Sequence, residues 1–520
     1  MIKKEKYSNI MEFPKVEIDF APKIKILKKE KDKTKINVRY ALVSPFCYAH
    51  IKWDSKLYEV VYKIEEPILT EREKLYKDQI VTAMRNLINF ESVIDNKKNT
   101  LLDYIDKRFR ILTVELGIKL SYESFRKIFY YLTRDFIGFD DADPLLRDYF
   151  VEDIECNGSN SPVYVIHRAF RNLKTTLKYD NNEDLASFVE KLAQRCGKYI
   201  SYSNPILDGS LPDGSRVNAT YTKDITSKGP TFTIRKFTKT PWTPSQLLEF
   251  KTLSPEMLAY LWLLIEHKMS LVIAGGTASG KTTLLNAIAF FISPESRVVS
   301  IEDTRELNLP RENWLPSVVR NATGIEKVGE VDLFDLLRSS FRQAPDYVIV
   351  GEVRGKEAYV LFQGMASGHS SISTIHADSV DTLIKRLETP PINLSPTLLN
   401  VLDCVCIMTH AIVDKKETRK LKEIVEIMNV TPEGIALTNT PFVWNAADDK
   451  FYFKKDSKIF EKISKRYGKS LDEINLEFKR RVQIIYKMFQ KNINGFEEVQ
   501  EIINKYYKRP AEVLKEFDIE

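Results

Sequence analysis

The chain is poor in cysteine, with only five in 520 residues. No Cys-x-x-Cys pair is present to hold zinc, and the five are too few and too scattered for a disulfide framework. The closest two, Cys404 and Cys406, lie in an apolar run that favours a buried strand. These absences exclude a disulfide-stapled secreted domain and favour a reducing, cytoplasmic compartment.

Long hydrophobic runs are also missing. The apolar run Met257–Ile265 ends at charged side chains and is well short of the ~20 residues that a membrane-spanning helix needs. The opening Met-Ile-Lys-Lys-Glu-Lys is charged, so we expect no secretory signal peptide. Any membrane association is therefore expected to be peripheral.

Strong net charge is absent, and the small excess is unevenly placed. Residues 1–40 hold twelve Lys and Arg against six Asp and Glu, an excess equal to the +6 of the whole chain. This basic segment could dock on anionic lipid or on an acidic partner, and a solvated lysine surface explains it equally well. Without an aromatic–basic ladder, no nucleic-acid partner is expected. The lysines include Lys28, Lys29, Lys31, Lys33 and Lys35.

One complete phosphate-binding signature, Gly-x-x-x-x-Gly-Lys-Ser/Thr, is present. The apolar run Leu271–Ala274 precedes it like a buried strand, and a helical pattern follows it. Glycines let backbone amides turn toward a phosphate, and the helix N-terminus adds partial positive charge. We therefore predict nucleoside triphosphate binding, with Lys281 on the β- and γ-phosphates and Thr282 on Mg²⁺. The expected nucleotide-binding residues are Gly275, Gly276, Thr277, Ala278, Ser279, Gly280, Lys281, Thr282 and Thr283.

Carboxylates follow two predicted strands downstream. Glu302 and Asp303 end the first and are expected to bind Mg²⁺, partly through water, because parallel strands present ligand-binding residues at their carboxyl ends. A carboxylate that caps the start of a loop is the alternative for this segment. The second, Tyr347–Val350, is expected to lie beside the phosphate loop, with Glu352 just past its end. Glu352 is predicted to position or activate water, with help from Glu302. A plain ion pair between Glu352 and Arg354 is the alternative.

The segment Gly368–Asp378 holds two of only six histidines among many hydroxyl side chains. His376 is predicted to sense the γ-phosphate by hydrogen bonding at the end of a short strand. A metal site formed by His369, His376 and Asp378 is an alternative that residue type alone allows.

Length and patterning predict several domains. Beyond a proline-rich linker, strands and helices alternate as in a parallel sheet with crossovers. The predicted parts are a basic strand-rich segment (1–68), a helical bundle (69–140), an α/β domain (141–237), a linker (238–244) and a nucleotide-binding domain (245–520) whose last helices begin at about 456.

The four stretches between residues 275 and 378 resemble, as a set, the signature boxes of the type II/type IV secretion ATPases. The resemblance implies an α/β fold: a RecA-like P-loop NTPase C-terminal domain, and an α+β N-terminal domain carrying a helical subdomain. It also implies a hexameric ring that hydrolyses ATP to ADP and phosphate with Mg²⁺. An Asn-Lys-x-Asp guanine signature is missing, which favours ATP.

Two upstream segments, Leu211–Val217 and Thr233–Phe237, resemble N-domain segments of this family. The resemblance implies that Arg216 and Arg235 contact the phosphates, stabilise transition-state charge and couple domain closure to the nucleotide state. Which arginine enters its own site and which a neighbour's stays open.

Within the superfamily, the stretches Tyr40–Ile51, Arg134–Gly138, Asp143–Leu146 and Arg386–Pro396 are similar to the archaeal branch that powers the archaellum. The tetracysteine zinc subdomain of many bacterial relatives is missing, and Gly355 stands where those relatives carry an aspartate. The resemblance implies a motor for assembly, and also for rotation, of the archaellum. An ATPase for an adhesive archaeal type IV pilus or for secretion is the alternative.

The resemblance also implies partners and a location. The partners are further copies of the chain in a homohexamer, a polytopic membrane platform protein and accessory cytoplasmic motor proteins. The chain would be cytoplasmic and bound peripherally to the cytoplasmic face of the membrane. A RecA-like nucleic-acid translocase and a small-molecule kinase are the rival classes; DNA-stimulated turnover would favour the first, and an acceptor-dependent reaction the second.

Overall fold

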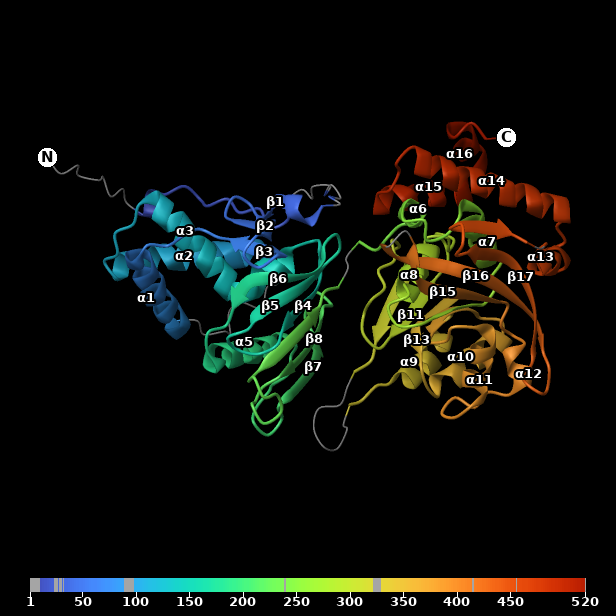
Figure 1. Ribbon diagram of the computed structural model, residues 1–520, viewed down its shortest axis with the longest axis horizontal. Helices are drawn as coiled ribbons and strands as arrows, with labels where there is room; N and C mark the ends of the chain where they lie inside the picture. Colours follow the sequence, from blue (N-terminus) through green and yellow to red (C-terminus); the bar gives the residue numbers. More distant parts are fainter. Residues whose placement is uncertain are drawn as a thin grey trace. The chain divides into compact units, whose positions relative to one another are not determined.

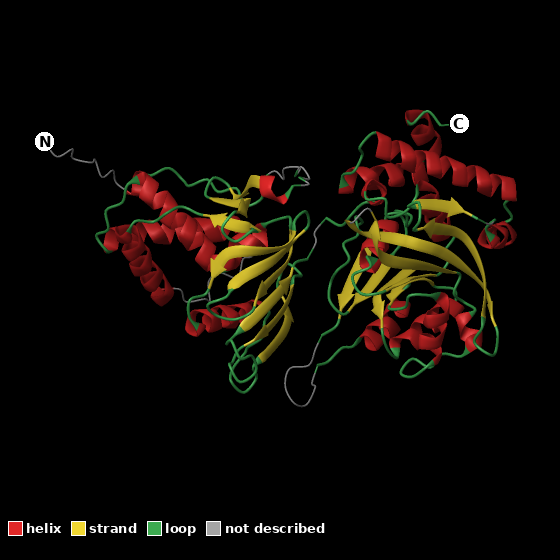
Figure 2. Cartoon of the chain, viewed as in Figure 1, coloured by secondary structure: helices red, strands yellow, loops and turns green. Residues whose placement is uncertain are grey.

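The computed structural model describes residues 10–22, 27, 30, 32–87, 98–237, 240–320, 329–413, 416–454 and 456–519. The chain forms two compact units, Met1–Phe237 and Thr238–Glu520 (Figure 1). Each unit contains its own nine-stranded sheet, drawn in yellow in Figure 2. Of the predicted basic segment, Lys28, Lys29 and Lys31 lie outside the described residues, and Lys33 and Lys35 belong to a short 3-10 turn.

The first unit joins strands from both ends of its sequence into one sheet. Among the strands that the structure describes in this unit, only β3 and β6 are parallel neighbours, paired through Val61–Lys174 and Tyr62–Thr175. The segments 1–68 and 141–237, expected as separate parts, therefore share one sheet and one apolar core. Pairing between such distant residues leaves no local sequence pattern. In sheet order the strands are β1 (Asn37–Val43), β2 (Cys47–Asp54), β3 (Glu59–Glu65), β6 (Arg171–Lys178), β5 (Pro162–His167), β4 (Val151–Cys156), β9 (Thr231–Arg235), β8 (Arg216–Thr220) and β7 (Ile206–Ser210).

Three mutually packed helices stand in the region expected to be helical. Aromatic side chains hold them together: the rings of Phe109 and Phe125 stack with centroids 4.5 Å apart, and Phe129 extends the stack. Ser121 caps α3 by accepting a hydrogen bond from the Ser124 amide. The helices of this unit are α1 (Glu71–Leu87), α2 (Lys98–Glu115), α3 (Tyr122–Phe136), α4 (Asp143–Arg147) and α5 (Asn182–Arg195).

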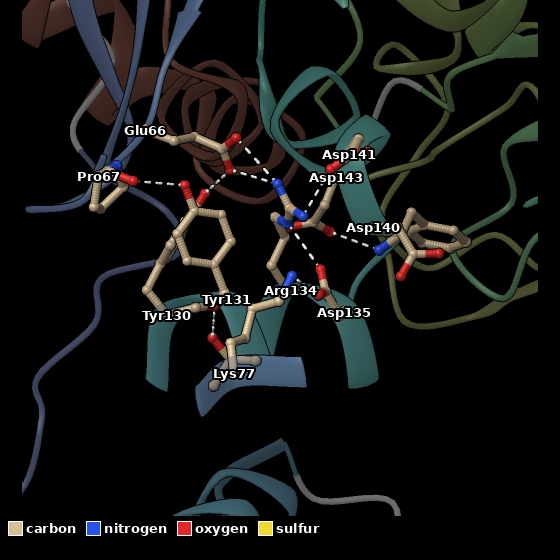
Figure 3. A network of polar contacts seen from close by, with 12 residues as sticks. Glu66, Pro67, Lys77, Tyr130, Tyr131, Arg134, Asp135, Asp140, Asp141 and Asp143 are labelled. Atoms are coloured by element: carbon tan, nitrogen blue, oxygen red, sulfur yellow. Dashed lines mark hydrogen bonds and ion pairs between the residues drawn. The ribbon is translucent and has the colours of Figure 1, made fainter. Parts of the chain in front are cut away.

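A buried polar network fastens α3 to the end of β3 (Figure 3). Nη1 of Arg134 donates to both carboxylate oxygens of Glu66 at 3.0 Å, and the Tyr130 hydroxyl donates to the same carboxylate at 2.7 Å. Asp135 and Asp141 supply two further ion pairs to Arg134. Burial lowers the pKa of Arg134, but these carboxylates outweigh it and raise that pKa above its usual value. The helices are therefore tied to the sheet by charge as well as by apolar packing.

The sheet of the second unit is parallel over six strands and antiparallel beyond them. The strand Tyr347–Val350, expected beside the phosphate loop, is part of β13, and β14 separates it from the phosphate-loop strand β10. Local sequence patterns do not encode strand order, which explains the error. In sheet order the strands are β12 (Trp314–Val318), β11 (Val298–Glu302), β13 (Tyr347–Val353), β14 (Ser370–Ile375), β10 (Leu271–Gly275), β15 (Cys404–Val413), β16 (Lys416–Val430), β17 (Ala436–Asn445) and β18 (Lys450–Phe453).

Helices cover both faces of this sheet (Figures 1 and 2). Leu271 and Ile273 of β10 enter one apolar core, and the alternating Val272 and Ala274 enter the other. An α/β fold of this kind confirms the predicted fold class. The helices up to residue 399 are α6 (Pro244–Glu249), α7 (Pro255–Glu266), α8 (Lys281–Ala289), α9 (Leu333–Ser340), α10 (Glu357–Ala366), α11 (Val380–Glu388) and α12 (Pro396–Leu399).

The apolar run near residue 260 is the buried helix α7, and the C-terminal helices pack against it. Trp262 of α7 stacks on Phe291 with centroids 5.0 Å apart and donates from Nε1 to the Tyr507 hydroxyl at 3.0 Å. No helix of the described residues is long and apolar enough to cross a membrane. The last helices are α13 (Lys458–Tyr467), α14 (Leu471–Gln490), α15 (Phe496–Lys508) and α16 (Pro510–Glu516).

Candidate functional site

The predicted phosphate loop connects β10 to α8 and needs glycine at two positions. Gly280, which precedes α8, has φ +95°, a left-handed conformation that side chains other than glycine rarely adopt. At Gly275 a Cβ would lie 2.5 Å from the Met408 carbonyl oxygen on the neighbouring strand, so only glycine fits. Ser279 closes the turn by donating to the Gly276 carbonyl at 2.9 Å. The loop is therefore folded as the motif requires, with the N-terminus of α8 behind it.

Lys281 lies in the first turn of α8 with its side chain against the loop. Its residue is 8% exposed, whereas Gly276, Thr277 and Ala278 are exposed at the tip. Its Nζ donates to the carbonyl oxygens of Gly275 at 3.1 Å and Gly276 at 2.8 Å. Burial lowers the pKa of Lys281, and the charge of Glu352 partly opposes that change. The ammonium group is thus placed inside the curve of the loop, where an anion would bind.

Glu352 stands at the end of β13 between two basic side chains. Arg354 donates from Nη2 to Oε2 of Glu352 at 2.6 Å, and Nε2 of His376 lies 3.2 Å from Oε1. Burial raises the pKa of Glu352, but Arg354, His376 and Lys281 together lower it below its usual value. A carboxylate with this pKa is ionised at neutral pH. The ion pair with Arg354 is present, and it coexists with the position expected for a residue that orients water.

His376 reaches Glu352 because β14 lies between β10 and β13. Burial lowers the pKa of His376, and Lys281 lowers it further against the opposing charge of Glu352. His369 is at the other end of β14, where its ring lies 4.9 Å from that of Phe341. The alternative metal site of His369, His376 and Asp378 is therefore not formed, and the described residues contain no group of three potential His, Cys, Asp or Glu ligands.

Glu302 ends β11 and is almost completely buried, at 1% exposure. Its Oε1 accepts hydrogen bonds from the backbone amides of Glu306 and Leu307, both at 2.9 Å. Burial raises the pKa of Glu302 to about 7, which these two amides only partly oppose. At Gly351, a Cβ would approach the Glu302 side chain to 3.0 Å, so the glycine makes room for this carboxyl group. Glu302 thus anchors a loop in addition to any role toward a metal.

The side-chain oxygen atoms at the carboxyl edge of the sheet fit the ligands that Mg²⁺ prefers. Oε2 of Glu302 and Oε1 of Glu352 are buried and have no hydrogen-bond partner among the described residues. Thr282 is partly exposed in the first turn of α8, and Asp303 is exposed after β11. Mg²⁺ is usually bound by one or two protein oxygens, substrate phosphates and water rather than by a protein cage. A hydroxyl and carboxylates at this edge meet that requirement.

Two residues at the site were not predicted from the sequence. Asn286 of α8 donates to the Glu306 carbonyl at 3.3 Å and accepts from the Asn308 amide at 3.1 Å, which joins α8 to the loop that Glu302 anchors. Arg419 of β16 donates from Nε to the Ala278 carbonyl at 2.9 Å. An asparagine inside a helix and an arginine in a strand carry no sequence signal for these contacts.

Arg216 and Arg235 belong to the first unit and stand directly opposite each other on β8 and β9. Nε of Arg235 lies 3.2 Å from Asp153, and Nη2 of Arg216 lies 3.5 Å from Asp208. The Arg235 side chain is 67% exposed and the Arg216 side chain is 41% exposed. Each guanidinium group is thus paired with a carboxylate of its own unit, which offsets the repulsion between like charges opposite each other on neighbouring strands.

Comparisons with known proteins show which family the chain belongs to. A family model described as "Type II/IV secretion system protein" matches residues 144–435. An uncharacterised protein of Methanocaldococcus jannaschii is 40% identical over 403 residues, covering 76% of this chain and 72% of the relative. The type IV secretion system protein PtlH of Bordetella pertussis is 34% identical over 228 residues, covering 39% of this chain and 67% of PtlH.

Among solved structures, the VirB11 ATPase of the Brucella suis type IV secretion system is 26% identical, covers 54% of this chain and 94% of its own, and has a TM-score of 0.28. The family match extends over more than half of the chain and includes the phosphate loop, Glu302, Glu352 and His376. The chain therefore belongs to the type II/IV secretion system protein family.

Proposed function

We propose that the chain is an ATPase that powers the assembly of a type IV pilus-like surface filament. The archaellum is the filament that we favour. The observation that carries the ATPase proposal is the convergence of Lys281, Glu352 and His376 at the carboxyl edge of β10, β13 and β14. A cation beside the phosphate loop stabilises charge on the phosphates, an ionised carboxylate can orient the attacking water, and the imidazole adds a hydrogen-bond donor.

Each group has a distinct part in the proposed reaction. Lys281 and the amides at the start of α8 bind the β- and γ-phosphates and stabilise charge on them. Glu352 accepts a hydrogen bond from the attacking water and orients it, while Arg354 keeps this carboxylate ionised. His376, 3.2 Å from Glu352, donates toward the γ-phosphate. Thr282, Glu302 and Asp303 would hold Mg²⁺, which supplies positive charge against the phosphates when bound.

The first unit contributes Arg216 and Arg235 in this proposal. Two exposed guanidinium groups on adjacent strands match an anionic phosphate chain. When hydrolysis removes the γ-phosphate, their hold on the nucleotide weakens and the two units move as rigid bodies. In a ring of six copies this movement would act on a polytopic membrane platform protein. The ring would lie at the cytoplasmic face of the membrane and would bind accessory cytoplasmic motor proteins. Secretion is the second candidate function, since PtlH is named as a type IV secretion system protein.

Paired variants test the ATPase proposal. Lys281→Ala should abolish turnover and ATP binding, because no other cation of the loop replaces its charge. Glu352→Gln should keep ATP binding and lower kcat by at least ~100-fold, the contribution typical of a group that acts on a proton in the transition state. Phosphate release and ATP titration give both quantities, with the exposed Lys385→Ala as the control. Unchanged turnover in either site variant would contradict the assignment.

The cellular role requires a separate experiment. Deletion of the gene should remove surface filaments and swimming, and the Glu352→Gln allele should fail to restore them. Normal swimming with lost adhesion would instead identify an adhesive pilus, and normal filaments with lost export would identify secretion. Mass measurement with ATP and Mg²⁺ should detect six copies of the chain.

A further inference from the structure

Arg419 lies against the outside of the phosphate loop. It is on β16 opposite His410 of β15, and its Nε donates to the carbonyl oxygen of Ala278 at 2.9 Å. Its Cδ is 3.3 Å from the position that a Cβ on Gly280 would take, so its aliphatic stem packs on the loop. The loop amides are the groups that turn toward a phosphate, whereas Arg419 bonds a loop carbonyl. Its hydrogen bond therefore occupies none of the loop amides.

The order of the strands fixes which part of a nucleotide would approach Arg419. Glu352 on β13 and His376 after β14 stand on one side of β10 and define the γ-phosphate end. A triphosphate that follows the loop places its nucleoside on the other side, where β15 and β16 lie. Arg419 is at the loop on that side.

The guanidinium group of Arg419 is available to a ligand. The residue is exposed, and neither Nη1 nor Nη2 makes a hydrogen bond or an ion pair within the part of the chain that the structure describes. Two other arginines near the site, Arg354 and Arg386, are bound to Glu352 and to the His376 carbonyl. A tethered planar guanidinium presents a face on which an aromatic base stacks well.

We propose that Arg419 binds the adenine ring of ATP by stacking its guanidinium plane on the base. This inference rests on the proposed ATPase function and extends it to the nucleoside end of the substrate. Lysine cannot replace it, because an ammonium group has no planar face.

Titration of the full-length chain with ATP and with inorganic tripolyphosphate, both with Mg²⁺, tests the proposal. Arg419→Ala should raise the Kd for ATP by about ten-fold, equivalent to one lost stacking contact, and leave the Kd for tripolyphosphate unchanged. Arg419→Lys should show the same loss for ATP. Lys422→Ala, an exposed change on the same strand, should alter neither.

Several outcomes would overturn the proposal. Equal losses for ATP and tripolyphosphate would mean that Arg419 supports the loop or binds phosphate, as would full rescue by lysine. If the wild-type chain bound tripolyphosphate as tightly as ATP, the base contact would be refuted and the phosphate loop would stand. If it bound neither ligand, both this inference and the ATPase function would fail. An unchanged melting temperature in Arg419→Ala verifies that the variant is folded.

Discussion

At the scale of single residues, Glu302 is a buried acid whose protonation depends on folding. Its ordinary pKa is 4.5, and burial raises it to about 7 in the folded chain. Between these values the folded chain holds a proton that the unfolded chain has released, so the free energy of unfolding falls as pH rises through this window. Above pH 7 the loss is complete and reaches about 3 kcal/mol.

Glu302→Gln should remove this pH dependence. The glutamine oxygen can still accept the amide hydrogen bonds of Glu306 and Leu307, and it carries no charge to desolvate. The variant should gain stability relative to the wild type between pH 5 and pH 8, by up to about 3 kcal/mol. Urea unfolding without Mg²⁺ or nucleotide measures this difference. Asp303→Asn, at the exposed neighbour, should change nothing, and parallel pH curves for wild type and Glu302→Gln would disprove the effect.

At the scale of secondary-structure elements, α14 docks on α7 through one buried arginine. The Arg481 side chain is 4% exposed, pairs with Glu266 through Nη2, and lies 5.0 Å from the Trp262 ring. Arg481→Ala should cost about 2 kcal/mol, because it deletes these contacts and leaves the Glu266 carboxylate partly buried beside an apolar helix. Thermal unfolding measures the loss. The exposed Lys479→Ala on the same helix should cost little, and an equally small effect of both changes would show that the pair does not fasten the helix.

The secondary-structure elements also show which features of the fold can be predicted from the sequence. The strand, turn and helix around Gly275–Thr282 are predictable because the motif's backbone requirements are local. The C-terminal helices are predictable from their apolar spacing and from caps such as Ser470, which forms a capping box with Glu473. The position of β14 between β10 and β13 is set by pairing between distant segments. The contact of Arg419 with Ala278 spans 141 positions, so no local pattern could indicate it.

At the scale of the whole molecule, the two units have separate apolar cores and should unfold in two transitions. If Arg216 and Arg235 bind phosphates as proposed, ATP should stabilise both units, because each then contributes contacts. In an Arg216→Ala, Arg235→Ala double variant, ATP should shift only the transition of the second unit, identified by comparison with isolated residues 240–520. Calorimetry distinguishes these cases. A wild-type chain in which ATP shifts a single transition would argue against the arginine contacts.

The family match begins at residue 144, just after the start of α4, so β1, β2, β3 and the first three helices lie outside it. Within the described part of the chain, these strands join the remaining sheet through the short parallel pairing of β3 with β6. Without them, β6 would become an edge strand with open backbone groups, the kind of edge on which chains aggregate. The strands β1, β2 and β3 thus cover a border of this sheet that would otherwise be open to pairing with other chains.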